Sequence, residues 1–234
     1  MALTDSIVAY WTMDESSGAN RLDSTGNSRT ATNFGTVTAG TGIISNGGSA
    51  WSDTNYLSVA DNDVFDATGA FSIQVWIRST AWSGASMTLL SQEASGNGWR
   101  LYMQGSGNPL VFQVNQATNH IATGTFSTST WYQIVVTRAS GGNITFYVNG
   151  SQDTAGQAYT APTVNTAAML MGRTVIEARP MNTNAVMDEI GFWNRELTSG
   201  EVSELYNSGA ALAYPFAAAG ATRDARALNM LGVG

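Results

Sequence analysis

The sequence predicts an all-β protein, an antiparallel β-sandwich of two packed sheets with one short helix near its C-terminus. Short runs rich in β-branched and aromatic residues recur along the 234 residues, separated by Gly, Asn, Ser and Asp. The chain has 25 glycines and only 4 prolines, a balance that suits many tight turns between strands. At this length a single sandwich domain can bury a large core.

Residues 71–78 (FSIQVWIR) show the clearest strand pattern, with apolar side chains at every second position. Such alternation indicates a strand that buries one face. Trp76 lies on the second face, which we therefore expect to be partly covered. The other predicted strands are Ser6–Met13, Tyr56–Val59, Met87–Ser91, Trp99–Met103, Leu110–Val114, Trp131–Arg138, Ile144–Val148, Ala168–Gly172 and Ala185–Trp193.

Turn and cap residues place the remaining elements. Asn149 and Gly150 follow a predicted strand and mark a tight hairpin turn, because both central positions of that turn need a positive φ. Thr198 is a predicted N-cap with Glu201 as its capping-box partner. The short helix that follows should end near Gly209 and pack on the sandwich.

The charge balance limits the partners. Only 12% of residues are charged, all ten basic residues are Arg, and the formal net charge is −7. This argues against a nucleic-acid partner, which needs clustered basic residues, and is compatible with a cation or a neutral glycan. The chain has no cysteine, which excludes disulfides and thiolate metal sites.

No segment reads as a targeting or membrane sequence. Residues 1–10 lack a basic start and a long apolar run, so they do not form a secretory signal. No stretch approaches the roughly 20 apolar residues that span a bilayer. If the protein acts outside a cell, we expect it to leave by lysis or by assembly into a particle.

The C-terminal residues differ from the rest. We place the sandwich domain at residues 1–214 and a tail at 215–234, because residues 216–234 (FAAAGATRDARALNMLGVG) are rich in Ala and Gly and end in an apolar stretch. A frayed terminus is one interpretation. We favour a docking or assembly segment that binds a neighbouring chain or its own domain.

Five motifs in order resemble the laminin-G-like, concanavalin A-like lectin/glucanase jelly-roll family over roughly residues 6–212. The longest, residues 184–207 (NAVMDEIGFWNRELTSGEVSELYN), resembles the closing strand and helix of that family. The other four are residues 8–15 with 23–27, residues 71–77, Trp131-Tyr132, and residues 146–150. The resemblance implies a jelly-roll sandwich, but this fold hosts lectins, adhesins, glycanases and structural modules.

The resemblance also implies one structural calcium ion. It places Asp188 as a carboxylate ligand and Asp14 as a second, with Asp23 and Asn27 as weaker candidates. Backbone carbonyls and waters would complete the coordination. The alternative is that Asp188 caps a turn or pairs with Arg195.

The sequence does not predict an enzyme. The adjacent acids Asp14-Glu15 and Asp188-Glu189 should point to opposite faces of their strands, so neither pair can flank a glycosidic bond. The Glu-x-Asp-x-Glu pattern of the glucanases with this fold is not present. His120, the only histidine, lies in a polar region, and we expect it in an exposed loop.

The seven tryptophans suggest a glycan-binding hypothesis. Trp51, Trp82 and Trp99 lie in or beside Gly/Ser-rich segments, so we predict them as candidates for stacking on a sugar, with packing at the edge of the core as the alternative. The remaining four lie within strand patterns and are predicted to be core residues. They are Trp11, Trp76, Trp131 and Trp193.

Three functions stay open. We expect first a phage virion protein of the capsid-decoration or tail-fibre type, located on the virion surface and bound to other virion proteins or identical copies through its tail. It would also bind a cell-surface glycan. The second is a lectin-like carbohydrate-binding or adhesion module of a bacterial surface or extracellular space, and the third a glycoside hydrolase or lyase. We expect no nucleic-acid partner and no membrane insertion.

Overall fold

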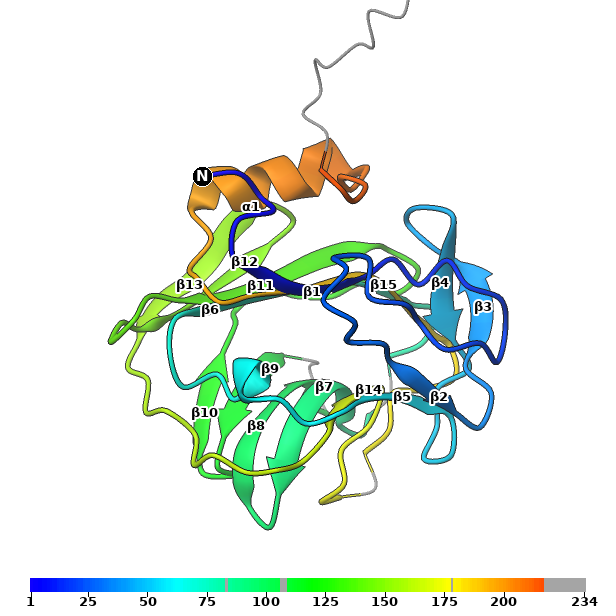
Figure 1. The fold of residues 1–234 in the computed structure, drawn as a ribbon, viewed down its shortest axis with the longest axis horizontal. Helices are drawn as coiled ribbons and strands as arrows, with labels where there is room; N and C mark the ends of the chain where they lie inside the picture. The colour runs from blue at the N-terminus through cyan, green and yellow to red at the C-terminus, as the bar shows by residue number, and fades with distance from the viewer. Residues whose placement is uncertain (83, 106–108, 178, 217–234) are drawn as a thin grey trace, which may run out of the picture.

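The computed structural model describes residues 1–82, 84–105, 109–177 and 179–216, and within them the chain is a two-layer antiparallel sandwich (Figure 1). Within the described residues, one sheet has eight strands. Seven of them follow the order β13-β12-β11-β6-β15-β4-β3, and the eighth, β1, pairs with β15. The other sheet has seven described strands in the order β10-β9-β8-β7-β14-β5-β2. The predicted two-sheet sandwich is confirmed.

The strands of the eight-stranded sheet are β1 (Ile7–Trp11), β3 (Thr38–Thr41), β4 (Asn46–Ser49), β6 (Phe71–Ser79), β11 (Tyr132–Arg138), β12 (Ile144–Val148), β13 (Ser151–Gln157) and β15 (Ala185–Trp193). Those of the seven-stranded sheet are β2 (Thr32–Phe34), β5 (Tyr56–Val59), β7 (Met87–Ala94), β8 (Asn97–Met103), β9 (Leu110–Val114), β10 (Thr118–Ile121) and β14 (Met169–Met171). A 3-10 helix, η1 (Asp63–Phe65), follows β5.

The main core lies between the sheets. Alternate residues of β6, namely Phe71, Ile73, Val75 and Ile77, are buried there, as their spacing predicts. The residues Trp11, Phe65, Trp99, Phe112 and Phe192 add large aromatic rings to the same cluster. Burying each large apolar side chain contributes about 1.5–3 kcal/mol relative to leaving it exposed.

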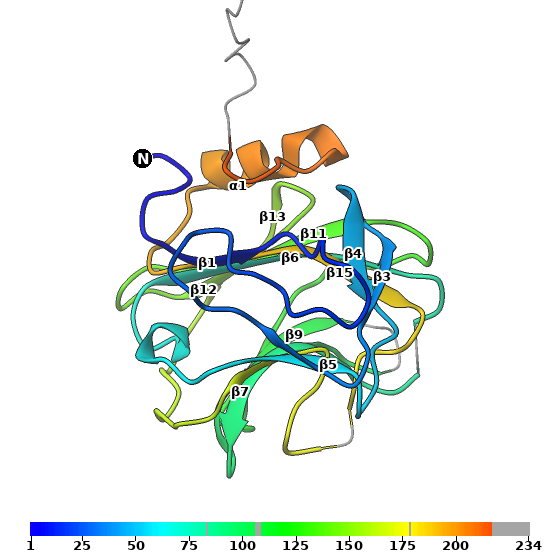
Figure 2. The same ribbon diagram turned by 45° about the vertical axis from the view of Figure 1, so that its right-hand side comes forward.

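A second apolar cluster lies on the outer face of the eight-stranded sheet, beneath the helix α1 (Ser199–Tyr206) (Figures 1 and 2). Thr198 caps this helix and forms the predicted capping box with Glu201. The helix ends earlier than predicted, because Asn207 adopts the left-handed conformation (φ 48°) at its C-cap, and a short 3-10 turn, η2 (Asn207–Gly209), carries the chain to Gly209. Trp76 stacks on Tyr206 of the helix with ring centroids 5.7 Å apart, which confirms that the second face of β6 is covered.

The packed domain extends two residues beyond the predicted boundary at Tyr214. Phe216 is buried, and its ring lies 5.1 Å from Tyr10 and 6.3 Å from Trp193. Residues 217–234, the rest of the predicted docking tail, lie outside the described residues. Among the described residues, no helix is long and apolar enough to cross a membrane.

Candidate functional site

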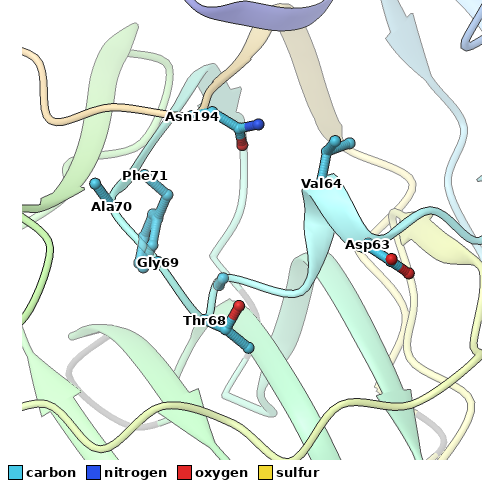
Figure 3. Close-up of a pocket in the computed structure, with 8 residues that line it drawn as sticks. Asp63, Val64, Thr68, Gly69, Ala70, Phe71 and Asn194 are labelled. Atoms are coloured by element: carbon cyan, nitrogen blue, oxygen red, sulfur yellow. The ribbon is translucent and has the colours of Figure 1, made fainter.

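A hollow of about 360 Å³ opens at one end of the sandwich, where the start of β6 meets η1 and the residue that follows β15 (Figure 3). Its walls include Val64 of η1, Phe71 of β6 and the turn at residues 67–70. The side chains of Thr68 and Asn194 point toward the hollow, whereas the Asp63 carboxylate points away from both (Figure 3). A volume of this size lies within the range of small-molecule sites.

Thr68 and Asn194 are free to bind a ligand. Both residues are exposed, and neither side chain makes a hydrogen bond to any part of the chain that the structure describes. The Thr68 hydroxyl can donate one hydrogen bond and accept at least one, and the Asn194 carboxamide offers both a donor and an acceptor. Beside them the half-buried side chain of Val64 supplies an apolar wall, whereas Phe71, which also lines the hollow, is only 1% exposed.

Buried anchors hold the hollow in shape. Trp99 donates its indole N–H to the carbonyl of Phe65 (2.7 Å), which fixes η1 from the core side. Arg138 donates to the carbonyl of Thr68 (3.1 Å), and the amide N–H of Asn194 donates to the carbonyl of Ser6 (2.9 Å). The site is therefore preformed, which lowers the entropy cost of binding.

Asp66, directly after η1, is part of the same support. Gln92 of β7 donates from its side-chain amide to the Asp66 carboxylate (2.9 Å). Burial raises the pKa of Asp66, and the hydrogen bond from Gln92 opposes that rise. This acid is tied to the core of the molecule, so it supports the wall of the hollow and does not line it.

The two residues predicted as calcium ligands meet at one turn. Asp188 is fully buried, and one of its carboxylate oxygens accepts the backbone N–H groups of Ile43 (2.8 Å) and Ile44 (3.1 Å) in the β3–β4 turn. Asp14 accepts the N–H of Asn46, the first residue of β4 after that turn (3.1 Å). A Cβ at Gly42 would collide with the Asp188 carboxylate, so a glycine is needed there.

This donor set fits a turn and not a calcium ion. Calcium binds six to eight oxygens, whereas the donors that face Asp188 are N–H groups. Within the described ranges no group of three or more His, Cys, Asp or Glu side chains converges to hold a metal. The alternative that Asp188 caps a turn describes what is seen, and Arg195 pairs with Glu201 instead (2.7 Å). The calcium ion stays a prediction for which this geometry supplies no ligand set. The carboxylate of Asp23, a weaker candidate ligand, instead accepts the backbone N–H groups of Thr25 and Arg29 and so stabilises the turn before Arg29.

The expectation that Asp188 and Glu189 point to opposite faces is wrong. Glu189 has a φ of 47°, and the pairing of β15 with β6 shifts between Asp188 and Gly191, so a β-bulge interrupts the alternation. The Glu189 carboxylate accepts the hydroxyl of Tyr10 (2.5 Å), and its carbonyl accepts from Gln74 (3.2 Å). Both carboxylates are thus buried in one polar network on the side of the sheet that α1 covers.

Burial controls the ionisation of this pair. It raises the pKa of Asp188 to about 8, with the neighbouring Glu189 charge adding to the effect and the backbone N–H donors opposing it. Burial likewise raises the pKa of Glu189 to about 7, and the Tyr10 hydroxyl opposes the rise. Both carboxyl groups are less than 2% exposed, so a glycosidic bond in solvent cannot reach them.

Two of the three tryptophans predicted to stack on a sugar are unavailable. Trp51 and Trp99 are fully buried, and each satisfies its indole N–H within the core, Trp51 through the carbonyl of Gly48 (2.9 Å). At Trp51 two glycines, Gly48 and Gly172, let the backbone approach the ring, and that approach covers it. Trp82 is half-buried against Phe126, and its ligand-binding role stays a prediction.

The other aromatic and histidine predictions have mixed outcomes. Trp11, Trp76 and Trp193 are buried as predicted, whereas Trp131 is half-buried with Arg78 over its ring (5.2 Å). His120 does not lie in an exposed loop, because residues 118–121 form β10 and alternation turns its ring inward, where it is 2% exposed. Burial lowers its pKa.

Sequence reasoning missed the residues that line the hollow. Asn194 stands in the closing motif and Thr68 in a turn, and neither carries a pattern that separates a ligand group from an ordinary surface residue. It also missed Phe34, an exposed aromatic residue on a three-residue strand in a stretch without periodicity. Only the spatial neighbours distinguish these positions.

The fold is similar to solved binding domains. Botulinum neurotoxin type C, which interacts with two ganglioside molecules, matches with a TM-score of 0.71 and 19% identity over 88% of this chain and 52% of that chain. The binding domain of Paraclostridial Mosquitocidal Protein 1 matches with a TM-score of 0.72 and 20% identity over 88% of this chain and 53% of that one. The present chain thus spans about half of each.

No curated protein sequence matches this chain. A family model does match, over residues 46–203, and its description is the concanavalin A-like lectin/glucanases superfamily. The match covers more than half of the chain and includes the strands that frame the hollow, from β5 to β15. The chain therefore belongs to the concanavalin A-like lectin/glucanase superfamily.

Proposed function

We propose that this chain is a non-catalytic carbohydrate-binding module and that the hollow beside η1 holds the sugar. The observation that carries the proposal is the pair of free polar side chains, Thr68 and Asn194, facing a preformed hollow with an apolar wall. A pyranose ring has hydroxyl groups around its edge and C–H groups on its faces. It matches a site that combines hydrogen-bonding groups with an apolar wall.

The two acids near the hollow, Asp63 and Asp66, support a role in binding over one in hydrolysis. Glycoside hydrolysis needs two carboxyl groups on either side of the scissile bond. At the hollow, Asp63 points away and Asp66 is tied to Gln92. One similar solved structure is described as a binding domain, and another as a neurotoxin whose cell entry depends on interaction with gangliosides, which supports the same class of function.

A glycan-binding measurement tests the proposal. Asn194→Ala should weaken binding of the best sugar from a glycan array about two- to tenfold, because it removes one or two hydrogen bonds. Asn184→Ala is the matched control, since Asn184 is an exposed asparagine that precedes β15 as Asn194 follows it. Equal affinities of the two variants, or no saturable binding by the wild-type chain, would contradict the proposal.

We also propose, as the second candidate, that the module attaches to a particle such as a phage virion through residues 217–234. The packing of Tyr214 and Phe216 against Tyr10 supports it, because this packing holds the residues that precede the tail on the domain. Truncation after Phe216, which keeps the packed residues, should leave the melting temperature unchanged and abolish assembly into particles. Unchanged incorporation would exclude this role for the tail and leave a free or cell-surface module.

A further inference from the structure

Phe34 is the only exposed aromatic side chain among those that the structure describes, with 43% of its surface accessible. It lies on β2, the edge strand of the seven-stranded sheet, away from the residues that line the hollow. The other exposed large apolar side chains are aliphatic, so Phe34 alone among the described residues offers a flat aromatic ring to a ligand.

The ring is held in a fixed orientation. Phe34 stacks on Tyr56 of β5 with centroids 4.9 Å apart and planes 1° apart, and the Arg173 guanidinium lies 4.6 Å from the Tyr56 centroid. Arg173 is itself anchored by donation to the carbonyl of Asp53 (2.8 Å). Gly35, with a φ of +65°, brings the end of β2 against the backbone of Thr54, where a Cβ would collide. The platform is thus rigid before any ligand binds.

Two free hydroxyl groups lie on the same outer face of the sheet as the ring. Cross-strand pairing places Thr32 opposite Ser58 and Phe34 opposite Tyr56. Leu57 lies between Tyr56 and Ser58 and is buried in the core, so these four residues point outward. Neither the Thr32 nor the Ser58 hydroxyl makes a hydrogen bond to the described parts of the chain, and each lies about 7 Å along its strand from the neighbouring ring.

We propose that Phe34 and Thr32 form a second binding site, for a neutral hexopyranose. Tyr56 covers the face of the Phe34 ring that points toward β5, so one C–H face of the sugar packs on the opposite, open face, and a sugar hydroxyl bonds to Thr32 of the same strand. This inference shares the ligand class of the proposed function but does not depend on the hollow, because none of these residues lines it.

Charge and size decide the class of ligand. The nearby cation, Arg173, already faces Tyr56 and the Asp53 carbonyl, and the chain carries a net charge of −7, so an anionic sugar gains nothing here. A stable protein–protein interface buries roughly 800 Å² of surface on each partner and has an apolar centre. Here the apolar surface is a single phenyl ring, and the hydroxyl groups beside it make the surrounding surface polar. A single sugar ring matches its dimensions.

The test titrates the whole chain with three sugars, lactose, cellotetraose and 3′-sialyllactose. Binding of each sugar is measured by the changes in the backbone amide chemical shifts. The neutral probes should shift residues 32–34 and 56–58, and Phe34→Ala should weaken that binding about two- to tenfold. Phe34→Trp should retain or strengthen it. Ile121→Ala is the matched control, because Ile121 is 42% exposed on β10, the opposite edge of the same sheet.

The outcomes separate the two sites. Shifts at residues 32–34 that persist in Asn194→Ala support the second site even if the hollow fails, and shifts confined to the hollow overturn the second site while the proposed function stands. Equal binding by Phe34→Ala and Ile121→Ala also overturns it. The second site is also overturned if analytical sedimentation shows a dimer for the wild type and a monomer for Phe34→Ala, because a second copy of the chain would then cover the ring.

Discussion

The outer faces of the two sheets both carry aromatic side chains, yet they differ in what covers them. On the eight-stranded sheet, α1 and residues 214–216 cover Tyr10, Trp76 and Trp193, so these rings form a second core. On the seven-stranded sheet the edge pair of Phe34 and Tyr56 has no such cover, and Phe34 reaches solvent. An outward-facing aromatic residue therefore contributes to stability or to binding according to what lies above it.

The comparison predicts its largest effect on the covered face. Trp193→Ala should lower the free energy of unfolding by about 3–5 kcal/mol, because it leaves a large cavity under α1 and removes the hydrogen bond from the indole to the carbonyl of Leu3. Urea denaturation measures the loss. Trp193→Phe, which keeps most of the volume, should lose less, and a loss below about 1 kcal/mol for Trp193→Ala would show that the helix does not seal a core.

The ion pair that fixes the start of α1 should come next. Burial opposes ionisation of Glu201, but hydrogen bonds from Arg195 and Thr198 outweigh it and lower its pKa to about 2. Glu201→Gln should cost about 1–2 kcal/mol at pH 7. A lowered carboxyl pKa stabilises the fold above the unfolded-state value, and this contribution is lost as the pH falls toward 2.

Denaturation at pH 3, 5 and 7 measures this effect, and the difference between wild type and Glu201→Gln should shrink in acid. Glu204→Gln, on the exposed side of the same helix, is the control and should change little at any pH. A constant difference between wild type and Glu201→Gln across this range would rule out the ionised pair as its cause.

The buried acids of the covered face should give the opposite pH dependence. Because burial raises the pKa values of Asp188 and Glu189, the folded state holds protons that the unfolded state releases, and stability should fall as the pH rises from about 5 to 8. Glu189→Gln keeps an acceptor for the Tyr10 hydroxyl and removes one charge. It should reduce this fall by on the order of 1 kcal/mol, measured by urea denaturation at pH 5 and 8. An unchanged fall would place its origin elsewhere.

The uncovered face should respond least in stability. Phe34→Ala should change the free energy of unfolding by no more than about 0.5 kcal/mol, because the ring is already half in water and only its stacking on Tyr56 is lost. Urea denaturation beside Ile121→Ala provides the measurement. A loss as large as that of Trp193→Ala would make Phe34 a structural residue.

Chelation should have no effect if Asp188 holds a turn. Because the Asp188 carboxylate faces N–H donors, removing divalent cations should leave the melting temperature within about 1 °C in a thermal scan with and without EDTA. A rise in the melting temperature on adding calcium would instead support the predicted ion and show that the β3–β4 turn rearranges to bind it.

The long apolar strands and the helix cap could be read from the sequence, whereas the short polar strands could not. β6, β11 and β15 have enough apolar residues to show their type, and Thr198 with Glu201 marks the start of α1. By contrast, β3, β4 and β13 contain mostly Gly, Ser, Thr and Gln, and they form only because neighbouring strands supply their hydrogen-bond partners. Local propensity is a weak guide at such edges.

For the site residues, too, the sequence predicted local features and failed where the tertiary structure decides. Trp51 and Trp99 stand in turn-rich stretches, where sequence reasoning predicts exposure, but the tertiary fold closes over them. Glu189 should alternate with Asp188, but the bulge turns both acids into one network. The ligand groups at Thr68 and Asn194 are neighbours only because the start of β6 and the end of β15 meet at one end of the sandwich.

By itself, the sequence determined that this chain is a two-sheet sandwich with a capped helix, because hydrophobic alternation and turn residues act over a few positions. It also determined the family, through motifs spread along the chain. Which aromatic rings are covered, which acids share a network and which polar groups face a hollow were decided only by the tertiary structure. Those properties depend on what lies above each residue, and residues far away in the chain supply that cover.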